Sequence, residues 1–189
     1  MMKKLVFLMT LIVGIILSQN LMTNVTFAAA ISNQEIPVII ISEDSDFKAK
    51  RYTDMINSTL AKSNKNITIL YSEDYQNKYA NYWADKNLDT LEEPMPTKTD
   101  LINFVSYGNY NKVIYLIVKD VEITAAGKGS NNATYVSVTA SAYLVDKQKI
   151  IKTSTFTRED SSHRHIDSMK FFAFRKFIRD VSKEFSSSI

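Results

Sequence analysis

The 189-residue sequence contains no cysteine. This absence excludes disulfide bonds, thiolate metal sites and cysteine nucleophiles. We also expect no lipid anchor, because lipoprotein anchoring requires a cysteine at the cleavage site. A chain without covalent cross-links depends on its core for stability, and 45% hydrophobic residues are enough to build one.

Glycine is also scarce, with four residues in the chain. Gly127 and Gly129 lie in a polar stretch between two predicted strands. A phosphate-binding loop instead needs its glycines between a strand and a helix. The Gly-x-Ser-x-Gly motif of serine hydrolases is absent. The sequence therefore predicts no cofactor and favours a non-catalytic protein over an enzyme.

Long apolar runs are missing outside the amino terminus. Residues 5–17 are almost entirely apolar and follow two lysines, Lys3 and Lys4. This run is shorter than the roughly 20 residues that a membrane-spanning helix needs. Small residues follow at 28–30, where a signal peptidase can cut. We therefore expect residues 1–30 to be a secretion signal and the protein to be periplasmic or extracellular, with a retained amino-terminal anchor as the alternative.

The remaining chain, residues 31–189, has the length of a single domain. Removing Lys3 and Lys4 lowers the formal net charge from +3 to +1. A charge this small produces no overall field that would favour nucleic acid or an anionic surface. We expect no nucleic-acid partner, and contact with a membrane only through the signal.

Hydrophobic periodicity predicts alternating strands and helices in the first half of the domain. The β-branched run at 38–41 predicts a central strand that is covered on both faces. A helix follows with Ser45 or Asp46 as its N-cap, and a second strand follows at 66–72. These elements form a β-α-β unit, whose strands are parallel and whose crossover is right-handed.

Two further helices are predicted between the second and third strands. The first covers residues 73–91 and the second covers 101–105, with Thr99 or Asp100 as its N-cap. One face of the first helix carries the aromatic residues Tyr75, Tyr79, Tyr82 and Trp83. We interpret this face as core, and the alternative is an exposed patch that stacks on sugar rings.

The second half of the chain predicts a three-stranded antiparallel meander over residues 112–157, followed by a helix from Ser162 to about Phe185. The whole order is β-α-β-α-α-β-β-β-α. This order predicts an α/β (α+β) fold with a single mixed sheet of about five strands and helices packed on it.

Two segments of the meander, "NYNKVIYLIV" and "VSVTASAYLVDKQKIIKTS", carry a family resemblance. The order of elements is similar to the envelope domain shared by three groups of bacterial proteins. These are the amino-terminal part of the Tol-system β-propeller protein, the lipoprotein activators of penicillin-binding proteins, and the curli secretion subunit. The resemblance implies a protein-binding module and no catalytic residues. The chain departs from this pattern at Asn109-Tyr110-Asn111, where the family commonly has Gly-Ala-Asp.

Both histidines of the chain, His163 and His165, lie near the start of the last predicted helix. On a strand the two imidazoles would lie on one side and could bind a metal together with Asp160. On a helix they would diverge by about 200°. We interpret the stretch as a helix start capped by Ser161 or Ser162, and we predict no metal site.

Basic residues line the final helix opposite its apolar stripe: Arg175, Lys176, Arg179 and Lys183. A row of this kind is usually a solvated face. The alternative is a contact with an acidic partner or an anionic polymer.

These patterns predict an exported, non-catalytic envelope domain that binds a protein partner, or a second copy of itself, through an exposed sheet edge. The polar hairpin tip is the other predicted contact, with Lys128, Ser130, Asn131 and Asn132. The alternative function is a glycan-binding protein or a small hydrolase. Its ligand contacts would come from Tyr75, Tyr79, Trp83, His163 and His165.

Overall fold

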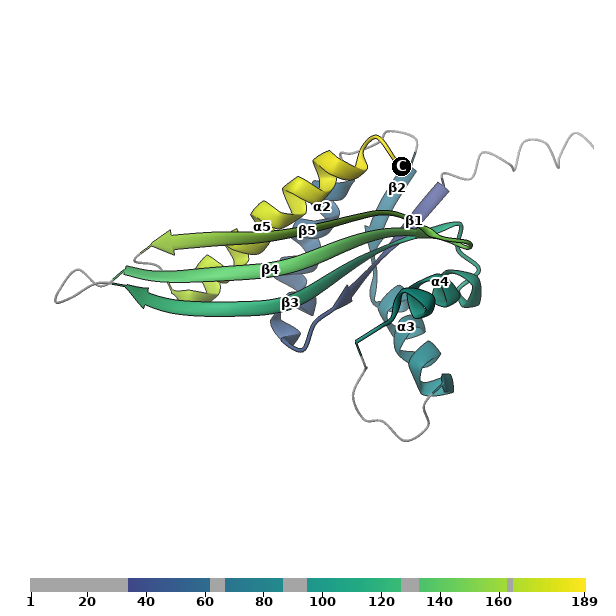
Figure 1. The fold of residues 1–189 in the computed structure, drawn as a ribbon, viewed down its shortest axis with the longest axis horizontal. Helices are drawn as coiled ribbons and strands as arrows, with labels where there is room; N and C mark the ends of the chain where they lie inside the picture. The colour runs from purple at the N-terminus through teal and green to yellow at the C-terminus, as the bar shows by residue number, and fades with distance from the viewer. Residues whose placement is uncertain (1–33, 62–66, 87–94, 127–132, 163–164) are drawn as a thin grey trace, which may run out of the picture. The chain divides into compact units, whose positions relative to one another are not determined.

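The computed structural model describes residues 34–61, 67–86, 95–126, 133–162 and 165–189 (Figure 1). The elements in chain order are β1 (Gln34–Ile41), η1 (Ser45–Lys48), α2 (Lys50–Leu60), β2 (Ile67–Tyr71), α3 (Glu73–Lys86), α4 (Lys98–Tyr107), β3 (Lys112–Ala126), β4 (Ala133–Asp146), β5 (Ile150–Ser162) and α5 (Ile166–Phe185). They form one mixed sheet with helices on both faces, so the predicted fold class and element order are confirmed. No described helix is both long and apolar enough to cross a membrane.

The five strands lie in the order β2-β1-β3-β4-β5. β1 pairs in parallel with β2 and β3, and β3, β4 and β5 form the predicted antiparallel meander. β1 is interior and buried on both faces, but it is second in the sheet, and β3 takes the middle position. β3 spans 15 residues and pairs with the 8-residue β1 on one side and with all of β4 on the other.

One face of the sheet is covered by α2 and α5. The apolar stripe predicted for the last helix, including Phe174, Phe177 and Val181, packs against alternate residues of β4 such as Val138 and Ala140. All five of these side chains are fully buried. The alternate residues of β4 thus pack in one core with the apolar residues that recur at the helical period in α5.

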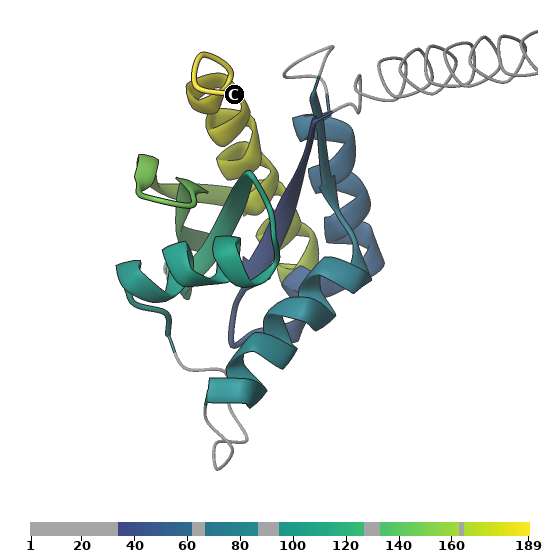
Figure 2. The ribbon, with the colours of Figure 1, turned by 90° about the vertical axis from the view of Figure 1, so that its right-hand side faces the viewer.

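The opposite face is covered by α3 and α4, which lie over the parallel part of the sheet. Figure 2 shows α2 and α4 on opposite sides of β1. Tyr79 and Phe104 pack here against Ile39 and Tyr115, so alternate residues of β1 and β3 serve the second core. Both faces of β1 and of the first half of β3, residues 113–118, are therefore buried, which explains their continuous apolar runs.

A β-bulge in β3 changes which residues face the core. The register shifts between Val118 and Asp120, so that Asp120 lies opposite Thr139 and Val121 lies opposite Val138. Without the extra residue, Asp120 would follow Val118 onto the face that α5 covers. The bulge instead places Val121 against that core.

Several element boundaries differ from the sequence prediction. α4 begins at Lys98 with Thr97 as N-cap, and Asp100 completes a capping box at the third helical position, so neither Thr99 nor Asp100 is the cap. The first helical turn after β1 is a 3-10 turn whose N-cap is Asp44. The prediction of Ser45 or Asp46 was one to two residues late.

Asn109 follows the Gly108 C-cap of α4 and has a φ of 56°, in the left-handed region. Glycine adopts this conformation most readily, and asparagine is one of the few other residues that tolerate it. Asn109 therefore provides, without glycine, the left-handed residue in the turn from α4 into β3.

Candidate functional site

The tyrosine-rich helix α3 lies with its aromatic face in the core. Tyr79, Tyr82 and Trp83 are 0%, 4% and 7% exposed, and Tyr75 is half-buried. Tyr79 lies edge-on to Phe104, with ring centroids 5.1 Å apart. This placement matches the core interpretation, and a sugar ring has no access to the faces of Tyr79 or Trp83.

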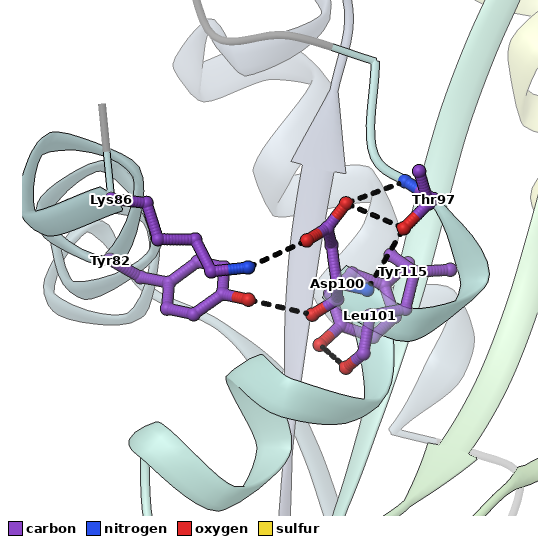
Figure 3. A network of polar contacts seen from close by, with 6 residues as sticks. All are labelled: Tyr82, Lys86, Thr97, Asp100, Leu101 and Tyr115. Carbon is purple, nitrogen blue, oxygen red and sulfur yellow. Dashed lines mark hydrogen bonds and ion pairs between the residues drawn. The ribbon is translucent and has the colours of Figure 1, made fainter.

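A polar network joins α3, α4 and β3 above this aromatic core (Figure 3). The hydroxyl of Tyr82 donates to the carbonyl of Asp100 at 3.3 Å, and that of Tyr115 donates to the carbonyl of Leu101 at 2.7 Å. Lys86 Nζ lies 2.7 Å from Asp100 Oδ1. These hydroxyls and charges are therefore used to hold α4 against the sheet.

The electrostatics of the network agree with this structural role. Burial raises the pKa of Asp100, but hydrogen bonds from Lys86 and Thr97 outweigh it, and the pKa is lowered overall. The hydrogen bond to Asp100 raises the pKa of Lys86. Both groups keep their charges at neutral pH, which suits an ion pair and not a general acid or base.

The structure describes one of the two histidines that the alternative function would use as ligand contacts. His165 is exposed and occupies the N-cap position of α5 without a side-chain capping bond. Ser161 and Ser162 are the last residues of β5 and pair with Tyr135 and Thr134 of β4, so the prediction that they cap α5 was wrong. Strand pairing takes precedence over helix capping at these serines. His163 lies outside the described residues.

The predicted partner-binding residues at the hairpin tip, Lys128, Ser130, Asn131 and Asn132, also lie outside the described residues. The described part of the meander leads up to this tip from β3 and continues from it into β4. Their assignment therefore stays a prediction.

A cluster of charges follows the carboxyl end of β1. Lys170 of α5 places its ammonium 2.7 Å from Asp44 and 2.5 Å from Asp46, and it lies over the ring of Phe47. Burial raises the pKa of Asp44, but hydrogen bonds from Lys170 and from the Asp46 amide lower it overall. The cluster ties α5 to the loop after β1.

Two side-chain amides complete the backbone hydrogen bonds at one end of the β2 margin of the sheet. Asn57 of α2 accepts from the Tyr71 amide at 2.7 Å and donates to the Tyr71 carbonyl at 3.1 Å. Gln76 of α3 makes the same pair of bonds with Ile40, at 3.1 Å and 3.0 Å. Each amide replaces a missing strand residue, so no unpaired backbone group remains at Tyr71 or Ile40.

The β5 margin is different. β5 is a 13-residue edge strand with β4 as its only strand neighbour. Lys176 donates to the carbonyl of Glu159 at 2.6 Å, and Arg158 donates to the carbonyl of Thr157 at 3.0 Å. Within the described residues, no side chain accepts a hydrogen bond from a β5 backbone amide. This margin is the best candidate for a binding site on the sheet.

A groove of about 520 Å³ lies between α2 and α5. Its lining residues are Met55, Ser58 and Thr59 of α2 and Phe171, Arg175, Arg179, Ser182 and Lys183 of α5. The sequence showed that four basic residues lie along the last helix, but not that they divide between two surfaces. Lys176 pairs with Asp160 of β5, whereas the other three cations line this groove. The signal for the division is the four-residue spacing from Arg175 to Lys183.

No protein-family model and no curated protein matches the chain. Among solved structures, the fold is similar to that of PelC from Paraburkholderia phytofirmans, described as a dodecamer, with 14% identity, a TM-score of 0.40, and coverage of 77% of this chain and 86% of that one. A lipoprotein of Neisseria meningitidis has 12% identity and a TM-score of 0.41, with 78% and 99% covered. A minor lipoprotein of Acinetobacter baumannii has 11% identity and a TM-score of 0.36, with 82% and 91% covered. The chain is thus similar in fold to bacterial proteins that include lipoproteins, and at these values the likeness assigns no function.

Proposed function

We propose that the protein is an exported, non-catalytic domain of the bacterial cell envelope that binds a protein partner along β5. The observation that carries this proposal is that the side chains along the β5 margin donate to its carbonyl groups and, within the described residues, none accepts from its amides. Lysine and arginine have donors but no acceptors, so Lys176 and Arg158 can satisfy only carbonyl groups of the strand. The backbone amides of an edge strand then remain for the carbonyl groups of an added strand.

The side chains of β5 support the same mode of binding. Thr153, Thr155 and Thr157 are exposed on the sheet face that α5 does not cover. The hydroxyl groups of Thr155 and Thr157 form hydrogen bonds with those of Ser141 and Thr139 at 2.7 Å and 2.9 Å. From Lys152 to Ser162 this strand pairs with β4 in unbroken register, so a partner strand can add along the same stretch.

The test is capture of envelope proteins by the full chain and by an edge variant, Thr153→Lys with Thr155→Lys. Lysines on an edge strand oppose the approach of another strand. We expect the variant to lose the protein that the natural chain enriches, while a control, Thr124→Lys on β3, retains it. Equal loss in the control, or retention of the natural chain on purified peptidoglycan in place of a protein, would overturn the proposal.

A further inference from the structure

The α2–α5 groove combines an apolar floor with a row of uncompensated positive charge. Met55 and Phe171 supply the apolar surface, and Arg175, Arg179 and Lys183 supply the charge. No aspartate or glutamate is among the lining residues. A concave surface with these two properties suits a ligand that is both apolar and acidic.

The groove cations lack the carboxylate partners that several other cations of the described chain have. Elsewhere, ion pairs join Lys50 to Asp54, Lys86 to Asp100, Arg158 to Asp180, Lys170 to Asp44 and Asp46, and Lys176 to Asp160. Within the described residues, no carboxylate forms an ion pair with Arg175, Arg179 or Lys183. Like charges four residues apart on a helix repel one another. The row therefore carries an electrostatic cost that a bound anion would relieve.

A fourth cation lies at one end of the groove. The guanidinium of Arg51 is 4.0 Å from the ring centroid of Phe171. Tyr52, the next residue, contacts the rings of Phe171 and Phe174, so the start of α2 lies beside the first half of α5. Arg51 thus extends the positive charge beyond Arg175 and confines one end of the apolar floor.

We propose that the α2–α5 groove binds an acidic amphipathic helix of a partner protein. Successive cations of the row are four residues apart, a spacing of roughly 6 Å along the helix axis. Carboxylates four residues apart on a second helix repeat at the same distance, so each can face one cation. Arginine pairs with a carboxylate through two parallel hydrogen bonds, which adds register to the attraction.

The apolar floor favours an acidic helix over other anionic ligands. A helix that lies in a groove buries one apolar stripe there, and Met55 and Phe171 provide the surface for it. A phosphate polymer has charge but no apolar stripe. A membrane surface is planar, whereas the charges here lie along a concave groove between two helices.

The experiment uses a labelled, alanine-based helical peptide with three glutamates spaced four residues apart and two leucines on the adjacent row. Binding to the full chain is measured by fluorescence anisotropy. A second peptide has the same composition, with its glutamates on different faces. We expect the spaced peptide to bind at least tenfold more tightly than the rearranged peptide, and its affinity to fall as salt is added.

Matched variants locate the binding site. The groove variant carries Arg175→Gln, Arg179→Gln and Lys183→Gln, and the control carries Lys119→Gln, Lys147→Gln and Lys149→Gln, with the same change in net charge. We expect the groove variant to bind the spaced peptide at least tenfold more weakly and the control less than twofold. Circular dichroism establishes that both variants are folded.

Three results would overturn the proposal. The first is no binding of the spaced peptide to the natural chain, and the second is equal binding of both peptides. The third is tighter binding of inorganic polyphosphate or of vesicles of anionic phospholipid than of the spaced peptide. The edge variant Thr153→Lys with Thr155→Lys should bind the peptide normally, so this test is independent of partner binding by β5.

Discussion

At the β2 margin of the sheet, neutral amides complete the backbone hydrogen bonding of two residues, Tyr71 and Ile40. Asn57 and Gln76 each offer one donor and one acceptor, and each therefore binds both the amide and the carbonyl of a strand residue. Gln76 is buried and Asn57 is half-buried. Because no donor or acceptor is left over at Tyr71 and Ile40, another strand has nothing to pair with there.

At the β5 margin, the covering groups are cations on the surface. Arg158 and Lys176 donate hydrogen bonds to carbonyl groups of β5, and they also form ion pairs with Asp180 and Asp160. These side chains are a third to a half exposed, so they can move aside at little cost. The comparison teaches that neutral amides at the β2 margin satisfy a backbone donor together with an acceptor, whereas the cations at the β5 margin cover carbonyl groups alone.

The largest loss of stability is expected at Gln76, the buried amide at the β2 margin. Gln76→Leu keeps the side-chain volume but leaves both backbone groups of Ile40 unpaired. We expect a loss of about 3 kcal/mol in the free energy of unfolding, measured by urea denaturation. The neighbouring exposed change Asn77→Leu should alter stability by less than about 0.5 kcal/mol. Equal effects at both positions would show that the amide does not close this margin.

A smaller loss is expected at the half-buried amide. Asn57→Ala exposes the amide and carbonyl of Tyr71, which water can partly satisfy. We predict a decrease of about 2 kcal/mol in the free energy of unfolding. Asn103→Ala, at an exposed position of α4, is the matched control. A loss larger than that of Gln76→Leu would contradict the order set by burial.

Lowering the pH should distinguish the neutral amide contacts from the charged contacts, because only the charged contacts lose their contribution to stability. The pKa of Asp44 is lowered from 3.8, so its stabilising contribution is complete above that pH and is lost as the pH falls through the folded-state value. We expect Asp44→Asn to cost about 1 kcal/mol at pH 7, and progressively less as the pH is lowered below 3.8. Gln76→Leu should cost the same at every pH. Urea denaturation across this range measures both, and a pH-independent Asp44→Asn would refute the contrast.

The smallest change in stability is expected at the β5 margin. Asp180→Asn removes the partner of Arg158 and should alter the free energy of unfolding by less than about 1 kcal/mol. Removing the two cations themselves should have a clearer effect, on association between copies of the chain. Arg158→Thr with Lys176→Thr should increase self-association along β5, measured by sedimentation velocity. The reason is that charged side chains no longer oppose pairing with a second strand. A purely monomeric double variant would indicate that this margin is closed by something else.

The sequence predicted the elements well because their signals are local. The alternation of Val136, Val138 and Ala140 identifies β4, and the spacing of Phe174, Phe177 and Val181 identifies α5. The boundary between β5 and α5 was missed. Serine is a good N-cap in isolation, but Ser161 and Ser162 pair with β4, and the sequence does not show how far that ladder extends.

The binding surfaces were only partly predictable. The sequence indicated an edge strand in the meander and a basic row on the last helix. It did not show that Lys176 leaves the row to pair with Asp160, or that Met55 of α2 lies beside the remaining cations. Both facts depend on which helix packs next to which strand.

The sequence by itself determined the type and order of the strands and helices, because hydrophobic periodicity acts over a few neighbouring residues. Only the tertiary structure decided how the sheet margins are closed and where charge is left unpaired. Asn57 meets Tyr71 14 residues away, and Gln76 meets Ile40 36 residues away. A polar residue carries no local sign of so distant a partner, since that partner is defined by the topology of the sheet.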